Sequence, residues 1–318
     1  MSMVDVCIPI HQPNPEYLDS LLSSLARQSL RDFVVWAAID DAPAHLEEIF
    51  ESYKNTMNVQ AHRNYESWGM VQNWNRAVEL GSSPMAILVG QDDVLQPDAL
   101  EELSSALMSE SGAVLASSGR TFIDEYGLPL YPKLRLNDRS RIFVERDRYT
   151  LNQAELTYLC LRNGNAFGEP PAVLFSRRAF EAVDGYSSHL RHAVDVDFNL
   201  RMVALGSAVY VKKALLTRRR HSGAQTQLNI RDGTTSSERL HLLEAYSSSQ
   251  LLTYEQLGRC KAAVASHSLF DLLRGIKAGN SAVVRTNAKI LLALRTVSLR
   301  HLALRFKELI TGRNMDRR

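Results

Sequence analysis

The chain has 318 residues, of which 45% are hydrophobic and 23% are charged, and its formal net charge is +2. These values suit one large globular domain, or a domain with an appendage, and exclude a disordered, collagen-like or low-complexity chain. The three cysteines, Cys7, Cys160 and Cys260, lie too far apart for a disulfide framework or a cysteine-type zinc site, and the near-neutral charge indicates no nucleic-acid partner.

The start of the chain and its hydropathy favour a cytoplasmic protein. The first ten residues, MSMVDVCIPI, lack the charged segment and long apolar core of a secretory signal. No uninterrupted apolar run approaches the about 18–20 residues that span a bilayer. We therefore expect a cytoplasmic chain whose only membrane contact would be peripheral, at the inner face.

The first half of the chain alternates between apolar strands and amphipathic helices. The predicted strands are 4–10, 33–39, 59–62 and 85–89, and the predicted helices are 16–28, 44–54 and 68–80. This alternation predicts an α/β fold with a mostly parallel sheet and helices on both of its faces.

Polar residues follow three of these strands at the point where each strand ends. His11 follows the first strand, Asp40 and Asp41 end the second, and Asp92 and Asp93 follow the strand at 85–89. Because such sheets bind ligands beyond the carboxyl ends of their strands, we expect a binding site there. No glycine-rich phosphate loop follows the first strand, so a bound nucleotide would need Mg²⁺ or Mn²⁺ beside its phosphates. Solvated acids in turns are the alternative.

The pattern beyond residue 100 is less regular. We predict helices over 101–109 and 177–183, strands over 113–117, 172–175 and 209–211, a hairpin-like excursion at 121–129 and a charged loop over 131–148. Asp195 and Asp197 precede a further helix, where a carboxylate either caps the helix or serves a function. A basic loop, residues 218–223, follows the last strand and contains His221.

The C-terminal part is predicted to be helical, because residues 239–318 are rich in leucine and contain no proline. We place a domain over 1–225 and a helical region over 226–318, with a polar loop at 225–238 between them. Residues 285–318 carry nine Lys/Arg and two Asp/Glu. This basic excess would contact an anionic membrane surface, the acidic face of a partner or a second copy of the chain, unless it is solvated surface.

The order and spacing of these motifs resemble the inverting family-2 glycosyltransferases, which have the GT-A fold. The resemblance covers about residues 3–225. It rests on the opening VDVCIPIHQPNP, a strand that ends in Asp-Asp, a helix with Asn-Trp-Asn at 73–75, and the stretch GSSPMAILVGQDDVLQPDAL. It implies a GT-A domain with a C-terminal helical appendage.

The resemblance also implies a reaction. A sugar would pass from a nucleoside diphosphate sugar, of the UDP or dTDP type, to a hydroxyl of a carbohydrate or lipid-linked acceptor. The cofactor would be Mn²⁺ or Mg²⁺, and the setting would be bacterial surface polysaccharide or glycolipid synthesis. The segment 164–180 would frame the acceptor side of the cleft.

Residue by residue, the resemblance makes Asp195 the expected catalytic base. The expected donor-binding residues are Pro9, His11, Asp40, Asp41, Asn73 and Asp92, and the expected metal ligands are Asp93 and His221. The chain departs from the family pattern at Val194, where the family often has Glu, and at Gly90, where the DxDD motif has an acid.

Two other functions stay open on the sequence. A sugar-nucleotide pyrophosphorylase has a related fold, but that class usually opens with a glycine-rich loop, which IPIHQPNP lacks. A non-catalytic GT-A-like binding or scaffold protein is the other, and the departures at Gly90 and Val194 keep it open.

Overall fold

A computed structural model describes the chain except residues 1, 44–45, 131–142, 144, 221–232 and 312–318. Most of the charged loop predicted over 131–148, and the polar loop predicted at 225–238 as far as residue 232, therefore lie outside the described residues. Among the described residues, nine strands form one sheet in the order β3-β2-β1-β4-β8-β6-β9-β5, and β7 also pairs with β9. The strands are β1 (Val4–His11), β2 (Phe33–Asp40), β3 (Val59–Arg63), β4 (Met85–Leu88), β5 (Val94–Leu95), β6 (Ala113–Ile123), β7 (Arg148–Leu151), β8 (Val173–Ser176) and β9 (Ser207–Arg219).

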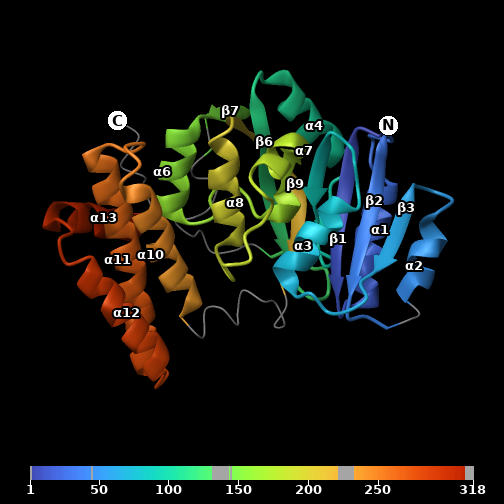
Figure 1. Ribbon diagram of the computed structural model, residues 1–318. Coiled ribbons are helices and arrows are strands. Elements are labelled where there is room, and N and C mark those ends of the chain that lie inside the picture. The colour runs from blue at the N-terminus through green and yellow to red at the C-terminus, as the bar shows by residue number, and fades with distance from the viewer. Residues whose placement is uncertain (1, 44–45, 131–142, 144, 221–232, 312–318) are drawn as a thin grey trace.

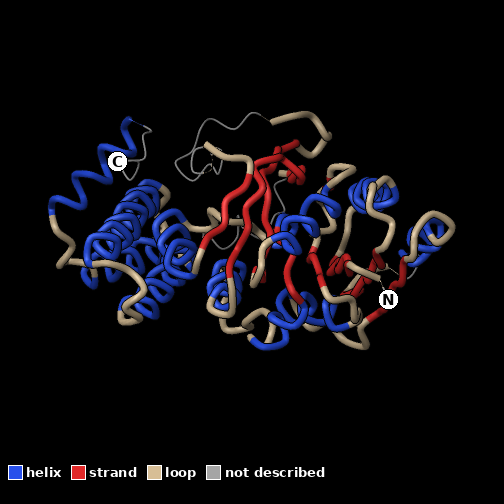
Figure 2. The backbone as a smooth tube through the Cα atoms, turned by 90° about the horizontal axis from the view of Figure 1, so that it is seen from above, coloured by secondary structure: helices blue, strands red, loops and turns tan. Residues whose placement is uncertain are grey.

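Helices cover both faces of this sheet, and further helices stand at one end of it (Figures 1 and 2). The helices of the first 210 residues are α1 (Pro15–Ala26), α2 (Leu46–Tyr53), α3 (Met70–Glu79), α4 (Ala99–Ser109), α6 (Gln153–Asn163), α7 (Arg177–Ala182) and α8 (Val194–Val203). The C-terminal helices are α10 (Thr234–Ser247), α11 (Tyr254–Lys277), α12 (Ser281–Ala293) and α13 (Leu299–Thr311). The predicted α/β architecture with a C-terminal helical appendage is confirmed.

The sheet is parallel in its N-terminal half and mixed beyond it. β1 pairs in parallel with β2 and β4, and β2 pairs in parallel with β3. β8 runs antiparallel to both β4 and β6, and β5 and β7 run antiparallel to β9. The expectation of a mostly parallel sheet thus describes the half built from strand–helix alternation. The second half departs from it because β8 lies antiparallel between β4 and β6, and because the short strands β5 and β7 pair antiparallel with β9.

Two strands are longer than the sequence indicated. β6 and β9 pair in parallel along their length, from Ala113 beside Ser207 to Ile123 beside Arg219. Gly119 permits their close approach, because a Cβ there would lie 2.8 Å from the backbone oxygen of Lys212. The first residues of the expected basic loop, 218–219, are therefore strand residues. The expected hairpin-like excursion at 121–129 is confirmed: its first arm is the end of β6, Ile123 forms an antiparallel bridge with Pro129, and Asp124 N–H donates to the Leu128 carbonyl oxygen at 2.9 Å.

The core consists of two hydrophobic clusters. One cluster joins the sheet to α1, α2 and α4 through residues such as Leu21, Phe50 and Leu103. The other joins the sheet to α3, α6 and α8 and continues into the C-terminal helices, where it includes Leu242 and Cys260. The C-terminal helices therefore share a core with the rest of the chain.

A buried ionic group fastens the last helix to α6. Glu308 of α13 accepts hydrogen bonds from Arg162 of α6 and from Arg305, and each of the three side chains is buried. Arg305 belongs to the stretch of basic excess, so part of that excess lies in the interior. In the described part of the chain, we find no helix with both the length and the apolar character needed to cross a membrane.

Candidate active site

A cavity of about 990 Å³ lies at the carboxyl ends of β1, β2 and β4. Seven of the nine residues singled out in the sequence line it, namely Pro9, His11, Asp40, Asn73, Asp92, Asp93 and Asp195. Asp41 is exposed and is not among the lining residues, and His221 lies outside the described residues. Carboxylates separated by about half the chain therefore meet in one cavity.

The ends of β1 and β4 are tied together by Gln91. Its side-chain amide donates to the His11 carbonyl oxygen at 2.8 Å, and its oxygen accepts the His11 N–H at 2.9 Å. This pair of hydrogen bonds holds the turn that carries Asp92 and Asp93 against the end of the first strand.

Asp93 is a buried carboxyl group at the cavity wall. Its Oδ1 accepts the backbone N–H of Arg219 at 3.2 Å. Burial raises the pKa of Asp93 to about 6, although Arg218 and the Arg219 N–H act in the opposite direction. Gly90 leaves room for this side chain, since a Cβ at that position would lie 2.9 Å from Asp93 Oδ2. The departure from DxDD at Gly90 thus has a packing reason.

A divalent cation fits this carboxylate as one ligand of several. Among the described residues, no group of three or more His, Cys, Asp or Glu side chains could hold a metal ion unaided. Asp93 and the neighbouring Asp92 would leave the remaining positions to phosphate oxygens and water, which Mg²⁺ and Mn²⁺ accept. A cation beside Asp93 would also offset the cost of ionising a buried acid.

Asp40 organises the loop that leads into α3. Its carboxylate accepts hydrogen bonds from the Ser67 hydroxyl at 3.2 Å and from the backbone N–H groups of Trp68 and Gly69 at 3.1 and 3.2 Å. Asp41 follows with a positive φ of 48°. The two acids of this pair therefore differ, because only the first is buried and lines the cavity.

Asn73 is buried behind the same wall. Its amide nitrogen donates to the carbonyl oxygens of Ile10 and Ala38, each at 3.2 Å, and its oxygen accepts from Asn64 at 3.0 Å. Since these partners occupy its polar atoms, Asn73 holds the ends of β1 and β2 together.

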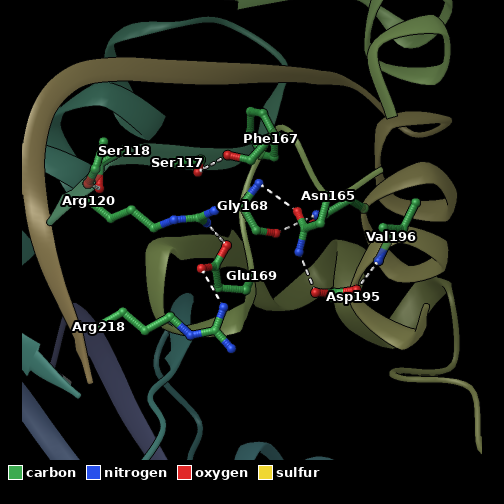
Figure 3. A network of polar contacts seen from close by, with 12 residues as sticks. Ser117, Ser118, Arg120, Asn165, Phe167, Gly168, Glu169, Asp195, Val196 and Arg218 are labelled. Carbon is green, nitrogen blue, oxygen red and sulfur yellow. Dashed lines mark hydrogen bonds and ion pairs between the residues drawn. The ribbon is translucent and has the colours of Figure 1, made fainter. Parts of the chain in front are cut away.

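Asp195 lies in the first turn of α8, where both carboxylate oxygens are held. Val196 N–H donates to Oδ1 at 2.8 Å, and the Asn165 amide donates to Oδ2 (Figure 3). Asn165 is itself oriented, because its oxygen accepts the Gly168 N–H at 3.0 Å. Burial raises the pKa of Asp195, while Val196 N–H, Arg218 and Asn165 lower it. The side chain is thus a fixed carboxylate with increased affinity for a proton.

One buried acid positions two arginines between these carboxylates. Glu169 pairs with Arg120 through one oxygen and with Arg218 through the other, the latter at 2.9 Å (Figure 3). Arg218 counteracts the burial that raises the pKa of both Asp93 and Asp195. Both carboxylates therefore feel the charge of the same guanidinium group.

A residue of α10 completes the support of Asp195. Glu238 accepts the backbone N–H groups of Arg191, His192 and Ala193 at 2.7, 2.8 and 2.8 Å. These amides form the turn directly before α8, so Glu238 fixes the chain that carries Asp195.

Sequence reasoning did not identify several of these residues. Asn165 and Glu169 lie in the stretch GNAFGEPP, whose glycines and prolines were the only local signal. Arg218 appeared only as part of a basic loop. Arg120 and Glu238 carry no local signal, because their partners are distant in sequence.

The segment 164–180 only partly frames the cavity. Its first part, including Asn165 and Glu169, lines the cavity. Arg177 instead lies at the opposite edge of the sheet, where it pairs with Asp5 at 2.8 Å and donates to the carbonyl oxygens of Ser83 and Val78. The second half of the segment therefore serves the fold, and the prediction for it was wrong.

Comparison with known proteins gives matches in sequence and in structure. A model of glycosyl transferase family 2 matches residues 5–183. The uncharacterized protein MT1568 of Mycobacterium tuberculosis (strain CDC 1551 / Oshkosh) is 25% identical over 233 residues, which cover 70% of this chain and 69% of that protein.

Two solved structures have a similar fold. TarS 1–349 of S. aureus, in complex with UDP-GlcNAc, superposes with a TM-score of 0.58 at 15% identity, covering 92% of this chain and 91% of that one. The mannosyltransferase PcManGT of Pyrobaculum calidifontis, in complex with GDP-Man and Mn²⁺, gives a TM-score of 0.58 at 12% identity, covering 98% and 80%. At these identities the likeness establishes the fold, and the predicted GT-A fold is confirmed.

Proposed function

This chain belongs to glycosyl transferase family 2, and we propose that it transfers a sugar from a nucleoside diphosphate sugar to an acceptor hydroxyl with inversion at the anomeric carbon. The observation that supports this most directly is the shared cavity, in which Asp93 and Asp195 lie under the influence of Arg218. One carboxylate then serves the leaving group and the other serves the nucleophile.

Asp195 is the general base in this proposal. A hydroxyl group is a weak nucleophile, so a carboxylate must accept its proton as it attacks. The acceptor oxygen forms a bond to the anomeric carbon, the bond from that carbon to the phosphate oxygen breaks, and the nucleoside diphosphate leaves with the bonding electrons. Attack from the face opposite the diphosphate inverts the centre. Val196 N–H and Asn165 keep the carboxylate oriented throughout.

The leaving diphosphate gains negative charge, and the wall of the cavity that carries Glu169 offers positive charge. Arg120 and Arg218, held by Glu169, would stabilise that charge. A divalent cation, Mn²⁺ or Mg²⁺, held by Asp93 with Asp92 beside it, would supply Lewis-acid stabilisation of the diphosphate. His221 remains our candidate for a further metal or phosphate contact.

We assign the donor to the ends of β1, β2 and β4. Pro9, His11 and Asp92 would contact it, and the buried Asp40 and Asn73 would act by holding its binding loops. Asp41 is exposed and lies outside the cavity lining, so we propose it as a contact only for a donor that extends beyond the cavity. UDP-GlcNAc in TarS and GDP-Man in PcManGT support a nucleoside diphosphate sugar, of which we propose the UDP or dTDP type.

For the acceptor, we propose a carbohydrate or lipid-linked hydroxyl compound of bacterial surface polysaccharide or glycolipid synthesis, used by a cytoplasmic enzyme. No observation favours the scaffold alternative. Gly90 has a packing reason beside Asp93, and Val194 is buried in the core, so neither departure requires loss of activity.

The test separates binding from transfer. A thermal-shift panel of nucleoside diphosphates with and without Mn²⁺ first selects the donor type, because a ligand that binds the native state raises the melting temperature. Asp195→Asn should still bind that donor and should transfer about 10²–10⁴-fold more slowly, the usual contribution of a general base.

Asp197→Asn is the matched control. Asp197 lies one residue further along α8 than Val196 and pairs with Arg201 at 2.8 Å, outside the cavity. It should transfer at close to the wild-type rate. Wild-type transfer by Asp195→Asn would place the base elsewhere.

A further inference from the structure

The cavity has a second wall, which the C-terminal helices help to build. Arg239 and Leu242 of α10 line it together with Leu161 and Gly164 at the end of α6. The Arg239 guanidinium lies against Gly164, since its Nη2 would be 3.0 Å from a Cβ at that position. Gly164 directly precedes Asn165, which binds Asp195. Arg239 is therefore on the side of the proposed base.

The Arg239 guanidinium lacks a direct partner in the part of the chain that the structure describes. Within the described ranges it has no hydrogen bond and no ion pair, although the side chain is partly buried. Burial lowers the pKa of Arg239, and Asp271 opposes this from beyond contact distance. Arg120 and Arg218 differ, because Glu169 holds both of them. A buried charge is usually paired. Because Arg239 has no such pair among the described residues, its N–H donors are available to a group in the cavity.

A second positive charge stands on the same wall. Arg191 lines the cavity, is exposed, and belongs to the turn whose N–H groups Glu238 accepts. Glu238 and Arg239 are neighbours in α10, so one helix fixes the backbone that carries Arg191 and supplies Arg239. Both arginines therefore line the same cavity as Asp195, and α10 holds the backbone of one and carries the other.

We propose that Arg239, with Arg191, binds an anionic group of the acceptor, a phosphate or a carboxylate, on the side of Asp195 away from the donor; this rests on the proposed transfer function. The planar guanidinium can donate two parallel hydrogen bonds to either group. The substrate class is then a phosphorylated or carboxylated acceptor. Neutral sugars would bind poorly, because they offer the Arg239 guanidinium no charged acceptor.

The test uses small anions on the full chain, with the donor side filled by UDP or GDP, whichever binds, and Mn²⁺. Calorimetric titration compares glycerol 3-phosphate, glycerate and glycerol. Wild type should bind one or both anions and should not bind glycerol. Preference for glycerol 3-phosphate identifies a phosphorylated acceptor, and preference for glycerate identifies a carboxylated one. Equal binding of glycerol, or no binding of either anion, would overturn the proposal.

Variants locate the site. Arg239→Gln should lose about tenfold or more in affinity for the preferred anion, the scale of one hydrogen bond to a charged group. Arg239→Lys keeps the charge and should recover part of the loss. The control, Arg285→Gln, changes an exposed arginine on α12 and should bind as wild type does. Unchanged anion binding by Arg239→Gln would contradict the assignment.

Donor binding separates this proposal from the proposed function. If Arg239→Gln lost the nucleoside diphosphate rather than the small anion, Arg239 would belong to the donor side and the acceptor assignment would be wrong. If wild type bound no nucleoside diphosphate at all, the proposed transfer would fail. The anion titrations, repeated without nucleotide, would still report on Arg239.

Discussion

Replacing Asn165 by alanine should shift the pH dependence of transfer. The Asn165 amide donates to Asp195 Oδ2, and it cannot turn away, because Gly168 N–H occupies its oxygen at 3.0 Å. Burial raises the pKa of Asp195, and Asn165 is one of the groups that lower it, with Val196 N–H and Arg218. Without Asn165, the ionised form of Asp195 loses one of the groups that stabilise it.

The expected size follows from the value of one hydrogen bond. A hydrogen bond to a charged group contributes about 1.5–3 kcal/mol, and we take the lower value because water can reach this partly buried carboxylate. That energy corresponds to about one pH unit. A general base must be ionised, so the rate falls as the pH drops through its pKa. In the pH–rate profile of Asn165→Ala, the acidic limb should therefore lie about one pH unit higher than in wild type. At higher pH the rates of the two proteins should converge on the same plateau.

The assay is the initial rate of transfer across the acidic and neutral pH range, at saturating donor and at two Mn²⁺ concentrations. Protons and metal compete for the same ligand, so a limb caused by Asp93 would move with Mn²⁺, and one caused by Asp195 would not. Asn163→Ala is the control, because the Asn163 amide donates to the Leu159 carbonyl and not to the cavity. Coincident limbs for wild type and Asn165→Ala would refute the reasoning.

Two further predictions concern the metal and the fold. Below about pH 6, which is the pKa of Asp93, protons occupy this carboxylate. Each further unit by which the pH falls should therefore raise the Mn²⁺ concentration needed for half-activation up to about tenfold. A Mn²⁺ requirement independent of pH would contradict this. Asp5→Ala should lower the free energy of unfolding by about 3–5 kcal/mol in urea, because it leaves Arg177 buried without its carboxylate. Arg178→Ala, an exposed neighbour, should stay within about 0.5 kcal/mol, and equal losses would argue against the buried pair.

The acids at the strand ends were predictable because their signals are local. An apolar strand followed at once by acids places Asp40 and Asp93 at a known edge of a parallel sheet, whatever the distant partners are. Asp195 was found through its place before a helix, aided by the resemblance. In each case, a few consecutive residues carried the information.

The remaining parts depend on contacts that no local pattern encodes. Glu169 joins Arg120 and Arg218, each of them 49 residues away in sequence. β9 was predicted too short, because its last residues are polar and basic. They remain in the sheet because β6 pairs with them and because Arg219 reaches the backbone of Asp92.

The three amides bound by Glu238 limit how this protein can be re-engineered. A chimera that exchanged the helices after residue 233 for those of another transferase would remove Glu238 and Arg239 together. The turn before α8 would then lose the carboxylate that accepts three of its N–H groups, even if the graft packed well. Exchanging the C-terminal helices would alter the rate of transfer as well as the packing of these helices on the rest of the chain. A successful graft must therefore begin after α10.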